Sequence, residues 1–335
     1  MSKQSVSMAD VARYAGVSPQ TVSRVANEHP GVVDGTRQRV LDAMEDLRYR
    51  PNSAARALKR GSFQSLGVVL SGLTSTGNYL TLEGIVRSAN QHGYSMTVMT
   101  LDEASDENLG NIFHRMSEAA VDGAILLLEI EAADELHLTR LPYDRLVIVD
   151  SNAAYRFPVV DSDQASGTRA VMDHLLGLGH STVHHVGGPE NSFSAAARAD
   201  SWREYLVAHG RPVPEPIIGD WSAESGYRAG VHIADDGVAT AVFVANDEMA
   251  LGLMRALGER GIRVPQDVSV VGFDDIALAA NFPVPLTTVH QNFDEVGRRC
   301  VEMLIRRIEG DSVPPGVDLV PTSLVVRQST APPWR

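Results

Sequence analysis

Short polar side chains follow several apolar runs of the sequence, at positions where the strands of a parallel sheet would end. They are Ser71, Asp150, Asn246 with Asp247, and Asp274 with Asp275. In open parallel α/β sheets, ligands bind outside the carboxyl ends of the strands. Planar polar groups at several strand ends suit sugar hydroxyls, which donate and accept hydrogen bonds together. The spacing therefore predicts a pocket for a small polar ligand.

Two larger side chains fit the same chemistry. Trp221 is suited to stack on the apolar face of a pyranose, and Arg198 is suited to donate to two hydroxyls at once. A plainer interpretation stands beside this one. An Asp or Asn after a strand is often only the N-cap of the next helix, which fits Asp247 and Asp275, and a single tryptophan is more often part of a core.

The elements that position these residues begin at Leu66. Apolar runs there alternate with amphipathic segments of helix length, as in βαβ units with helices on both faces of parallel sheets. The predicted strands are 66–70, 96–99, 124–128, 146–149, 183–186, 241–244 and 268–271, and helices are predicted over 79–92, 167–178 and 248–260. So many strands in one chain indicate two sheets rather than one.

The first sixty residues have a different pattern, with helices predicted over 8–15, 19–27 and 34–49. Ser18 is a good N-cap, and Pro19 stands at the first helical position, where its missing N–H is harmless. Two short helices at a sharp turn are typical of a helix-turn-helix, whose second helix lies in the major groove of DNA. A small helical bundle with ordinary surface polar groups is the alternative for the helix pair alone.

The polar residues of this headpiece divide into two predicted roles. Side chains at the start of the second helix would face base edges: Pro19, Gln20 and Arg24, where Gln can pair with adenine and Arg with guanine. Short polar groups suited to phosphate contacts are Ser18, Thr21, Asn27 and Thr36.

The charge distribution agrees with a protein that docks on phosphate by one end. The net charge is −13, yet residues 1–61 contain ten Lys/Arg and six Asp/Glu, which gives +4 and leaves −17 for the remainder. A cationic head on an anionic body favours DNA binding through the head alone.

Other function classes find little support in the sequence. Cys300 is the only cysteine, so a disulfide framework is excluded, and His180, His184 and His185 do not fit a metal site, because adjacent residues of a strand point to opposite faces. We find no signal peptide, no membrane-spanning run and no P-loop, nucleophile-elbow or zinc-protease motif. We therefore expect no catalytic residues, metal or cofactor, and a location in a reducing cytoplasm.

The string Met8-Ala-Asp-Val-Ala-Arg-Tyr-Ala-Gly-Val-Ser-Pro-Gln-Thr-Val-Ser-Arg-Val-Ala-Asn27 closely resembles the headpiece of the LacI/GalR family of bacterial transcription regulators. Arg50-Pro-Asn-Ser-Ala-Ala-Arg-Ala-Leu58 resembles the family's hinge helix. The resemblance implies that Ala55 and Leu58 lie in the minor groove, with Leu58 as an apolar wedge that kinks the duplex. The alternative is that Leu58 belongs to an ordinary linker and packs on the body.

The body resembles the regulatory domain of the same family, which is similar to periplasmic sugar-binding proteins. The lac-repressor branch is the most similar, through Gly219-Asp-Trp-Ser-Ala, Val244-Ala-Asn-Asp-Glu-Met-Ala-Leu-Gly252 and Val270-Val-Gly-Phe-Asp-Asp275. That branch binds galactosides. The resemblance assigns ligand binding to Ser71, Asp150, Arg198, Trp221, Asn246, Asp274 and Gln291.

The resemblance also implies a division of the chain. A DNA-binding headpiece would span 1–51 and a hinge helix with its linker 52–61. The body would have an N-subdomain of 62–161 plus 292–322 and a C-subdomain of 162–291 plus 323–330, followed by a tail over 331–335. The expected fold class is an all-α helix-turn-helix headpiece plus two doubly wound parallel-sheet subdomains.

Three departures from the lac-repressor pattern limit the comparison. Pro19 replaces a base-reading tyrosine, and the segment 74–80, expected beside the aglycone, differs in composition. The chain ends at Arg335 without leucine heptads, so a homodimer is expected rather than a tetramer. The resemblance as a whole predicts a repressor that binds operator DNA and is released from it by a galactoside inducer. A corepressor-activated regulator and a sugar solute-binding protein are the alternatives.

Overall fold

The computed structural model describes residues 6–27, 29–50, 61–70, 75–101, 106–130, 145–151, 154 and 156–334. The chain divides into two compact units, Met1–Phe63 and Gln64–Arg335. The hinge residues Ala55 and Leu58 and the predicted ligand residue Ser71 lie outside the described residues.

The first unit contains α1 (Met8–Ala15), α2 (Pro19–Ala26) and α3 (Asp34–Asp46). Ser7 and Asp10 form a capping box at the start of α1, and Gly16 ends this helix with a φ of +65°. Ser18 accepts a hydrogen bond from the Thr21 N–H and caps α2, as predicted. The three helices bury a small shared core of Val11, Ala12, Val22, Val25, Val40, Ala43 and Met44.

The third helix ends earlier than predicted, at Asp46 rather than at Tyr49. Arg48 adopts a left-handed φ of +49°, and the Tyr49 N–H donates to the Met44 carbonyl at 2.8 Å. This left-handed turn, rather than the following Arg50-Pro51 pair, terminates the helix.

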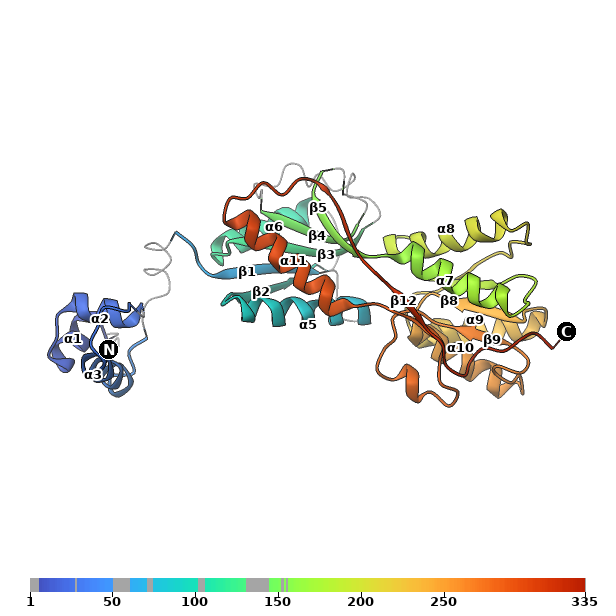
Figure 1. The fold of residues 1–335 in the computed structure, drawn as a ribbon, viewed down its shortest axis with the longest axis horizontal. Helices are drawn as coiled ribbons and strands as arrows, with labels where there is room; N and C mark the ends of the chain where they lie inside the picture. The colour runs from blue at the N-terminus through green and yellow to red at the C-terminus, as the bar shows by residue number, and fades with distance from the viewer. Residues whose placement is uncertain are drawn as a thin grey trace. The chain divides into compact units, whose positions relative to one another are not determined.

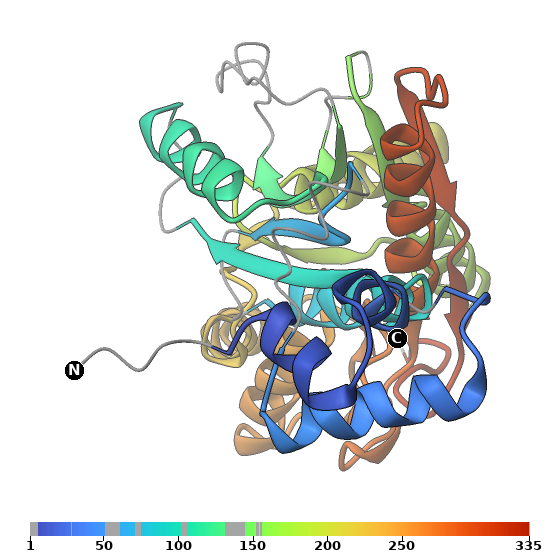
Figure 2. The same cartoon turned by 90° about the vertical axis from the view of Figure 1, so that its left-hand side faces the viewer.

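The second unit begins with a six-stranded parallel sheet in the order β11-β5-β4-β3-β1-β2. Its strands are β1 (Ser65–Leu70), β2 (Ser95–Thr100), β3 (Gly123–Ile130), β4 (Leu146–Ser151), β5 (Pro158–Ser162) and β11 (Gly316–Val320). Helices α5 (Thr76–Gln91) and α11 (Phe293–Ile308) pack on one face, and α6 (Asp106–Glu118) packs on the other (Figures 1 and 2).

A second, four-stranded parallel sheet has the order β7-β6-β8-β9. Its strands are β6 (His184–Gly187), β7 (Ile217–Ile218), β8 (Ala241–Val244) and β9 (Ser269–Val271). One core joins this sheet to α9 (Ala223–Asp236) and α10 (Asp247–Glu259), and another joins it to α7 (Gln164–Gly177) and α8 (Phe193–Ala208). Both sheets therefore carry helices on both faces, as predicted.

The chain passes between the two sheets three times, after β5, after β10 (Thr288–His290) and after β11 (Figure 1). Beside the second sheet, β10 pairs antiparallel with β12 (Ser323–Val325), and a short 3₁₀ helix, η3, spans Ala279–Asn281. The Ser329 hydroxyl then donates to the Val270 carbonyl and accepts from the Thr287 N–H, which fastens the C-terminal segment to this sheet.

The seven predicted strands are all present, although β6 begins one residue later than predicted and ends at Gly187. The sequence does not predict β5, β7, β10, β11 and β12. These strands have two to five residues, and β11 is an edge strand whose Val317 and Leu319 are exposed, so their sequences carry no clear periodic pattern.

Within the described residues, no helix is both long and apolar enough to cross a membrane.

Helices α9 and α10 approach each other closely enough for backbone contact. A Cβ at Gly252 would lie 1.8 Å from the Ala223 carbonyl oxygen, and one at Gly226 would lie 2.0 Å from the Met249 carbonyl oxygen. Only glycine fits at these two positions, because the obstructing atoms belong to backbone that cannot rotate away.

We predict that Gly252→Ala lowers the free energy of unfolding by at least about 1–3 kcal/mol, because the new methyl group forces the two helices apart. Gly258→Ala, on the same helix, is the matched control, since a Cβ there meets nothing within 4 Å. It should raise stability by about 0.5–1 kcal/mol through helix propensity. Urea titration of both variants tests this contrast, and equal effects would contradict the packing argument.

Candidate functional site

A polar pocket lies at the carboxyl ends of strands from both sheets and holds about 570 Å³ of space, part of it open to solvent. Its walls come from the ends of β4 and β5, the first turns of α5, α7, α8 and α11, and the loops after β7, β8, β9 and β10. Ligand pockets of open parallel α/β sheets commonly occur at such strand ends.

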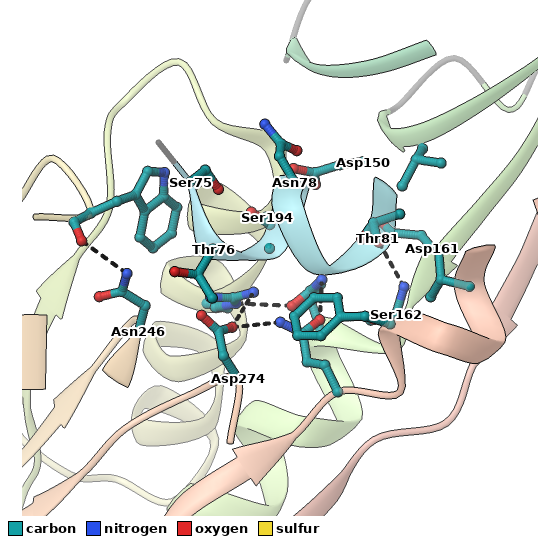
Figure 3. A pocket seen from close by; sticks show the side chains of 18 residues that line it. Ser75, Thr76, Asn78, Thr81, Asp150, Asp161, Ser162, Ser194, Asn246 and Asp274 are labelled. Carbon is teal, nitrogen blue, oxygen red and sulfur yellow. Dashed lines mark hydrogen bonds and ion pairs between the residues drawn. The ribbon is translucent and has the colours of Figure 1, made fainter. Parts of the chain in front are cut away.

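Six of the seven residues predicted to bind a ligand line this pocket: Asp150, Arg198, Trp221, Asn246, Asp274 and Gln291. They come from sequence positions up to 141 residues apart, and the fold brings them together (Figure 3). Of the segment 74–80, Ser75, Thr76, Gly77 and Asn78 also line the pocket.

A closed ring of buried polar side chains forms one wall. Arg198 Nε donates to Gln164 Oε1 at 2.9 Å, and Gln164 Nε2 donates to Gln291 Oε1 at 3.4 Å. Gln291 Nε2 donates to Asp274 Oδ1 at 2.7 Å, and Arg198 Nη2 lies 3.8 Å from the same oxygen. The ring fixes the orientation of four side chains before any ligand arrives.

Aromatic rings and a backbone carbonyl also hold the Arg198 guanidinium. Its central carbon lies 3.9 Å from the centre of the Phe273 ring and 5.6 Å from that of Trp221. Its Nη1 donates to the Ala245 carbonyl. The sequence predicts that Arg198 donates to two ligand hydroxyls. In the structure its Nε and Nη1 donate to protein oxygens and its Nη2 lies 3.8 Å from Asp274, so the guanidinium also holds Gln164 and Asp274 in place.

Trp221 owes its position to two other residues. A Cβ at Gly188 would lie 2.4 Å from the indole ring, so the ring packs directly on the backbone after β6. Asn246 Nδ2 donates to the Trp221 carbonyl at 3.0 Å, drawn as a dashed line in Figure 3. The indole is partly exposed and lines the pocket instead of being wholly buried in a core.

Asn246 also caps α10, because its Oδ1 accepts from the Met249 N–H at 2.9 Å. The prediction that Asp247 and Asp275 are N-caps is therefore wrong. Asp247 occupies the first helical position, and its carboxylate accepts from Thr288 Oγ1 at 2.6 Å, while burial raises its pKa well above the usual value. Asp275 instead pairs with Arg327 at 2.6 Å.

The sequence did not indicate several residues of this pocket. Asp161 and Ser162 are the last residues of β5, a strand that the apolar pattern does not reveal, Gln164 begins α7, and Ser194 belongs to the first turn of α8. A five-residue run, Pro158-Val-Val-Asp-Ser, was the only available signal.

Most of the described residues predicted to contact DNA lie on or beside α2. Pro19, Gln20 and Arg24 are exposed, whereas Val22 and Val25 on the opposite side of α2 are buried. Among the predicted phosphate-binding residues, Ser18 Oγ lies 3.0 Å from Thr21 Oγ1, and Asn27 Nδ2 donates to the Ser23 carbonyl at 2.6 Å. Thr36 is half-buried in α3.

The histidines of β6 are part of the sheet and its core. The buried His185 ring stacks on Phe243 at 4.8 Å between centres, its Nδ1 lies 3.0 Å from the Phe243 carbonyl, and burial lowers its pKa to about 4. In the part of the chain that the structure describes, no group of three His, Cys, Asp or Glu side chains is arranged to hold a metal ion.

Comparison with known proteins gives consistent matches to both units. Residues 7–52 match the bacterial regulatory proteins of the lacI family, and residues 172–330 match the periplasmic binding protein-like domain. The lactose operon repressor of Escherichia coli (strain K12) is 36% identical over 334 residues, which cover 98% of this chain and 91% of that repressor. The chain belongs to the lacI family.

Two other similar proteins support this assignment. The ribose operon repressor of Escherichia coli (strain K12) is 30% identical over 90% of this chain and 92% of its own length. A crystal structure of the lac repressor dimer bound to operator and the anti-inducer ONPF superimposes with a TM-score of 0.88 and 35% identity, covering 98% of this chain and all of that one. The expected fold class is confirmed. Because the chain belongs to the lacI family and these relatives are repressors, the protein is a transcription regulator and not an enzyme.

In this lacI-family body, we predict that Arg198→Met lowers the free energy of unfolding by about 3–5 kcal/mol, because Asp274 would remain as a buried charge without its counter-ion. A second change, Asp274→Asn, should recover part of that loss. Arg203→Met is the matched control on α8, since Arg203 is half-exposed and pairs with Asp200 at 3.7 Å. Its effect should stay within about 0.5 kcal/mol. Urea titration measures all three variants, and similar losses for Arg198 and Arg203 would contradict the prediction.

Proposed function

We propose that this protein is a homodimeric transcription repressor that binds operator DNA through its helix-turn-helix unit and is released from it by a small sugar, a galactoside. It would act at the nucleoid, in the bacterial cytoplasm. The single observation that carries the proposal is the pocket, in which carboxylates, amides and an indole converge from both sheets.

The chemistry of the pocket suits a neutral sugar. Asp150 and Asp274 accept hydrogen bonds from hydroxyls, and the amides of Asn246 and Gln291 both donate and accept. Trp221 offers an apolar surface for the C–H face of a pyranose. Together with Gln291, this tryptophan is also what links the pocket to the galactoside-binding branch of the family, so we favour a galactoside.

The first unit supplies the properties that operator binding needs. Its exposed α2 residues Gln20 and Arg24 are free of the small core, and both have side chains suited to base edges. Two copies in a dimer would read the two halves of a pseudo-palindromic operator in successive major grooves. Leu58 would enter the minor groove between them.

The pocket is placed to couple ligand binding to DNA binding. It draws residues from both sheets, and the chain crosses three times between those sheets, so a ligand that prefers one arrangement of the sheets shifts the balance between them. Such couplings amount to about 1–3 kcal/mol and are reciprocal, so operator DNA must weaken sugar binding by the same factor.

The experiment begins by selecting duplexes from a random pool with the full-length protein. The selected duplex is then used in gel-shift assays with and without methyl galactoside, ribose and cellobiose. We expect tight binding to selected DNA and release by the galactoside. Tighter DNA binding with a sugar would identify a corepressor, and no binding to any duplex would indicate a solute-binding protein.

A second prediction concerns base reading. Arg24→Ala should relax preference at one base pair of the selected site by about 1–3 kcal/mol while leaving the other positions unchanged. Arg13→Ala, which removes an equally exposed charge from α1, should change affinity for all duplexes alike. Repeating the selection with each variant tests this. A uniform loss for Arg24→Ala would mean that Arg24 contacts only phosphate.

A further inference from the structure

Asp161 lies beside Asp150 at the edge of the first sheet that faces the pocket. Strands β4 and β5 are parallel, with Ile148 paired to Val159 and Val149 paired to Val160. The next residue on each strand is an aspartate, and neighbouring strands are about 4.8 Å apart. The pairing of the two strands ends at Val149 and Val160, and Asp150 has a left-handed φ of +57°. Both carboxylates line the pocket (Figure 3).

Asp161 is as accessible as the residues that the family resemblance assigns to the ligand. Its exposed fraction is 5%, against 4% for Arg198 and 6% for Asp274. The Ser162 N–H donates to its Oδ1 at 2.7 Å. Since an ionised carboxylate offers about four acceptor sites, this bond leaves room for donors from a ligand.

The surroundings of Asp161 set its charge. Burial raises its pKa to about 6, and hydrogen bonds from Ser162 and Gln164 and the charge of Arg198 oppose the rise. Because the pKa of Asp161 is raised to about 6, each further hydrogen bond to the ionised carboxylate stabilises its charged form. Hydroxyl groups of a bound ligand are such donors.

Two ionised carboxylates at the ends of neighbouring strands accept hydrogen bonds and cannot donate them, so they match two O–H groups of one ligand. An anionic ligand group at the same place would meet like charges at short range. Among the pocket-lining residues that the structure describes, Arg198 is the only basic side chain, and it is held by Asp274 and Gln164.

We propose that Asp161 acts with Asp150 as a specificity-determining pair that binds two vicinal hydroxyls of the sugar and excludes phosphorylated and acidic sugars. The inference rests on the proposed function and deepens it, because it states which part of the sugar the first sheet recognises. The resemblance to the lac-repressor branch assigns no role to Asp161.

The test is isothermal titration of the full chain with methyl galactoside, its four monodeoxy analogues and galactose 6-phosphate. Asp161→Asn should weaken binding of the parent sugar by roughly 10- to 100-fold, the range expected for a hydrogen bond to a charged group. One analogue lacks the hydroxyl that Asp161 contacts. Wild type and Asp161→Asn should bind this analogue with the same affinity. Galactose 6-phosphate should bind at least roughly tenfold more weakly than the parent.

Asp163→Asn is the matched control, two residues away. It removes the same charge, and asparagine keeps the N-cap that Asp163 provides to α7 through the Ser166 N–H. Its sugar affinity should be at least that of wild type, because loss of the Asp163 charge lowers the pKa of Asp161 and favours its ionised form. A second measurement uses wild type alone and so does not depend on any variant folding. Two of the monodeoxy analogues, which lack hydroxyls on neighbouring carbons, should bind wild type more weakly than the parent sugar does.

The outcomes separate this inference from the proposed function. Unchanged sugar affinity in Asp161→Asn, tight binding of galactose 6-phosphate, or tolerance of every single deoxygenation would overturn the inference and leave the sugar-responsive repressor intact. If wild type binds none of the neutral sugars, the proposed function fails and the inference fails with it.

Discussion

Burial of the Arg198 guanidinium is the constraint on which the pocket depends. A charge that is 96% shielded from water needs a counter-charge and a full set of acceptors, and the chain supplies them from three separate segments. Asp274 provides the opposite charge, Gln164 and the Ala245 carbonyl accept hydrogen bonds, and Phe273 stacks on the planar face. All of these partners belong to the second sheet and the helices and loops around it, so folding of that part of the body already forms this wall of the pocket.

Much of the fold could be predicted from the sequence because long, periodic elements carry strong signals. The runs 66–70 and 124–128 are apolar on both faces, as in strands covered by helices on both sides, and the structure confirms them as β1 and β3. The Ser18-Pro19 start of α2 was equally clear, since a capping hydroxyl before proline has few other interpretations. By contrast, β5 has five residues and ends in polar side chains, which are also typical of a loop.

The same limit explains which site residues the sequence missed. Asn246 and Asp274 follow strong strands and match family motifs. Asp161 lies at the end of a weak strand and Gln164 just after it, and their neighbours in space lie on other segments. The ring through Gln164 and Gln291 joins residues 127 positions apart, a relation that no local pattern encodes. The error at Asp247 had a related cause. Its neighbour Asn246 is an equally good cap, and only the three-dimensional structure shows which side chain turns back to the helix.

The amide of Asn246 has two structural roles. Its oxygen caps the start of α10, and its nitrogen donates to the Trp221 carbonyl. A change at Asn246 would therefore alter both the stability of α10 and the position of Trp221 in the pocket. We expect few substitutions there among regulators that differ in ligand preference. Side chains such as Trp221 and Asn78 border the pocket without capping a helix, so new specificities can arise through them while the scaffold stays unchanged. The wall formed by the first turn of α5 is, on this argument, the part of the pocket in which related regulators are expected to diverge most.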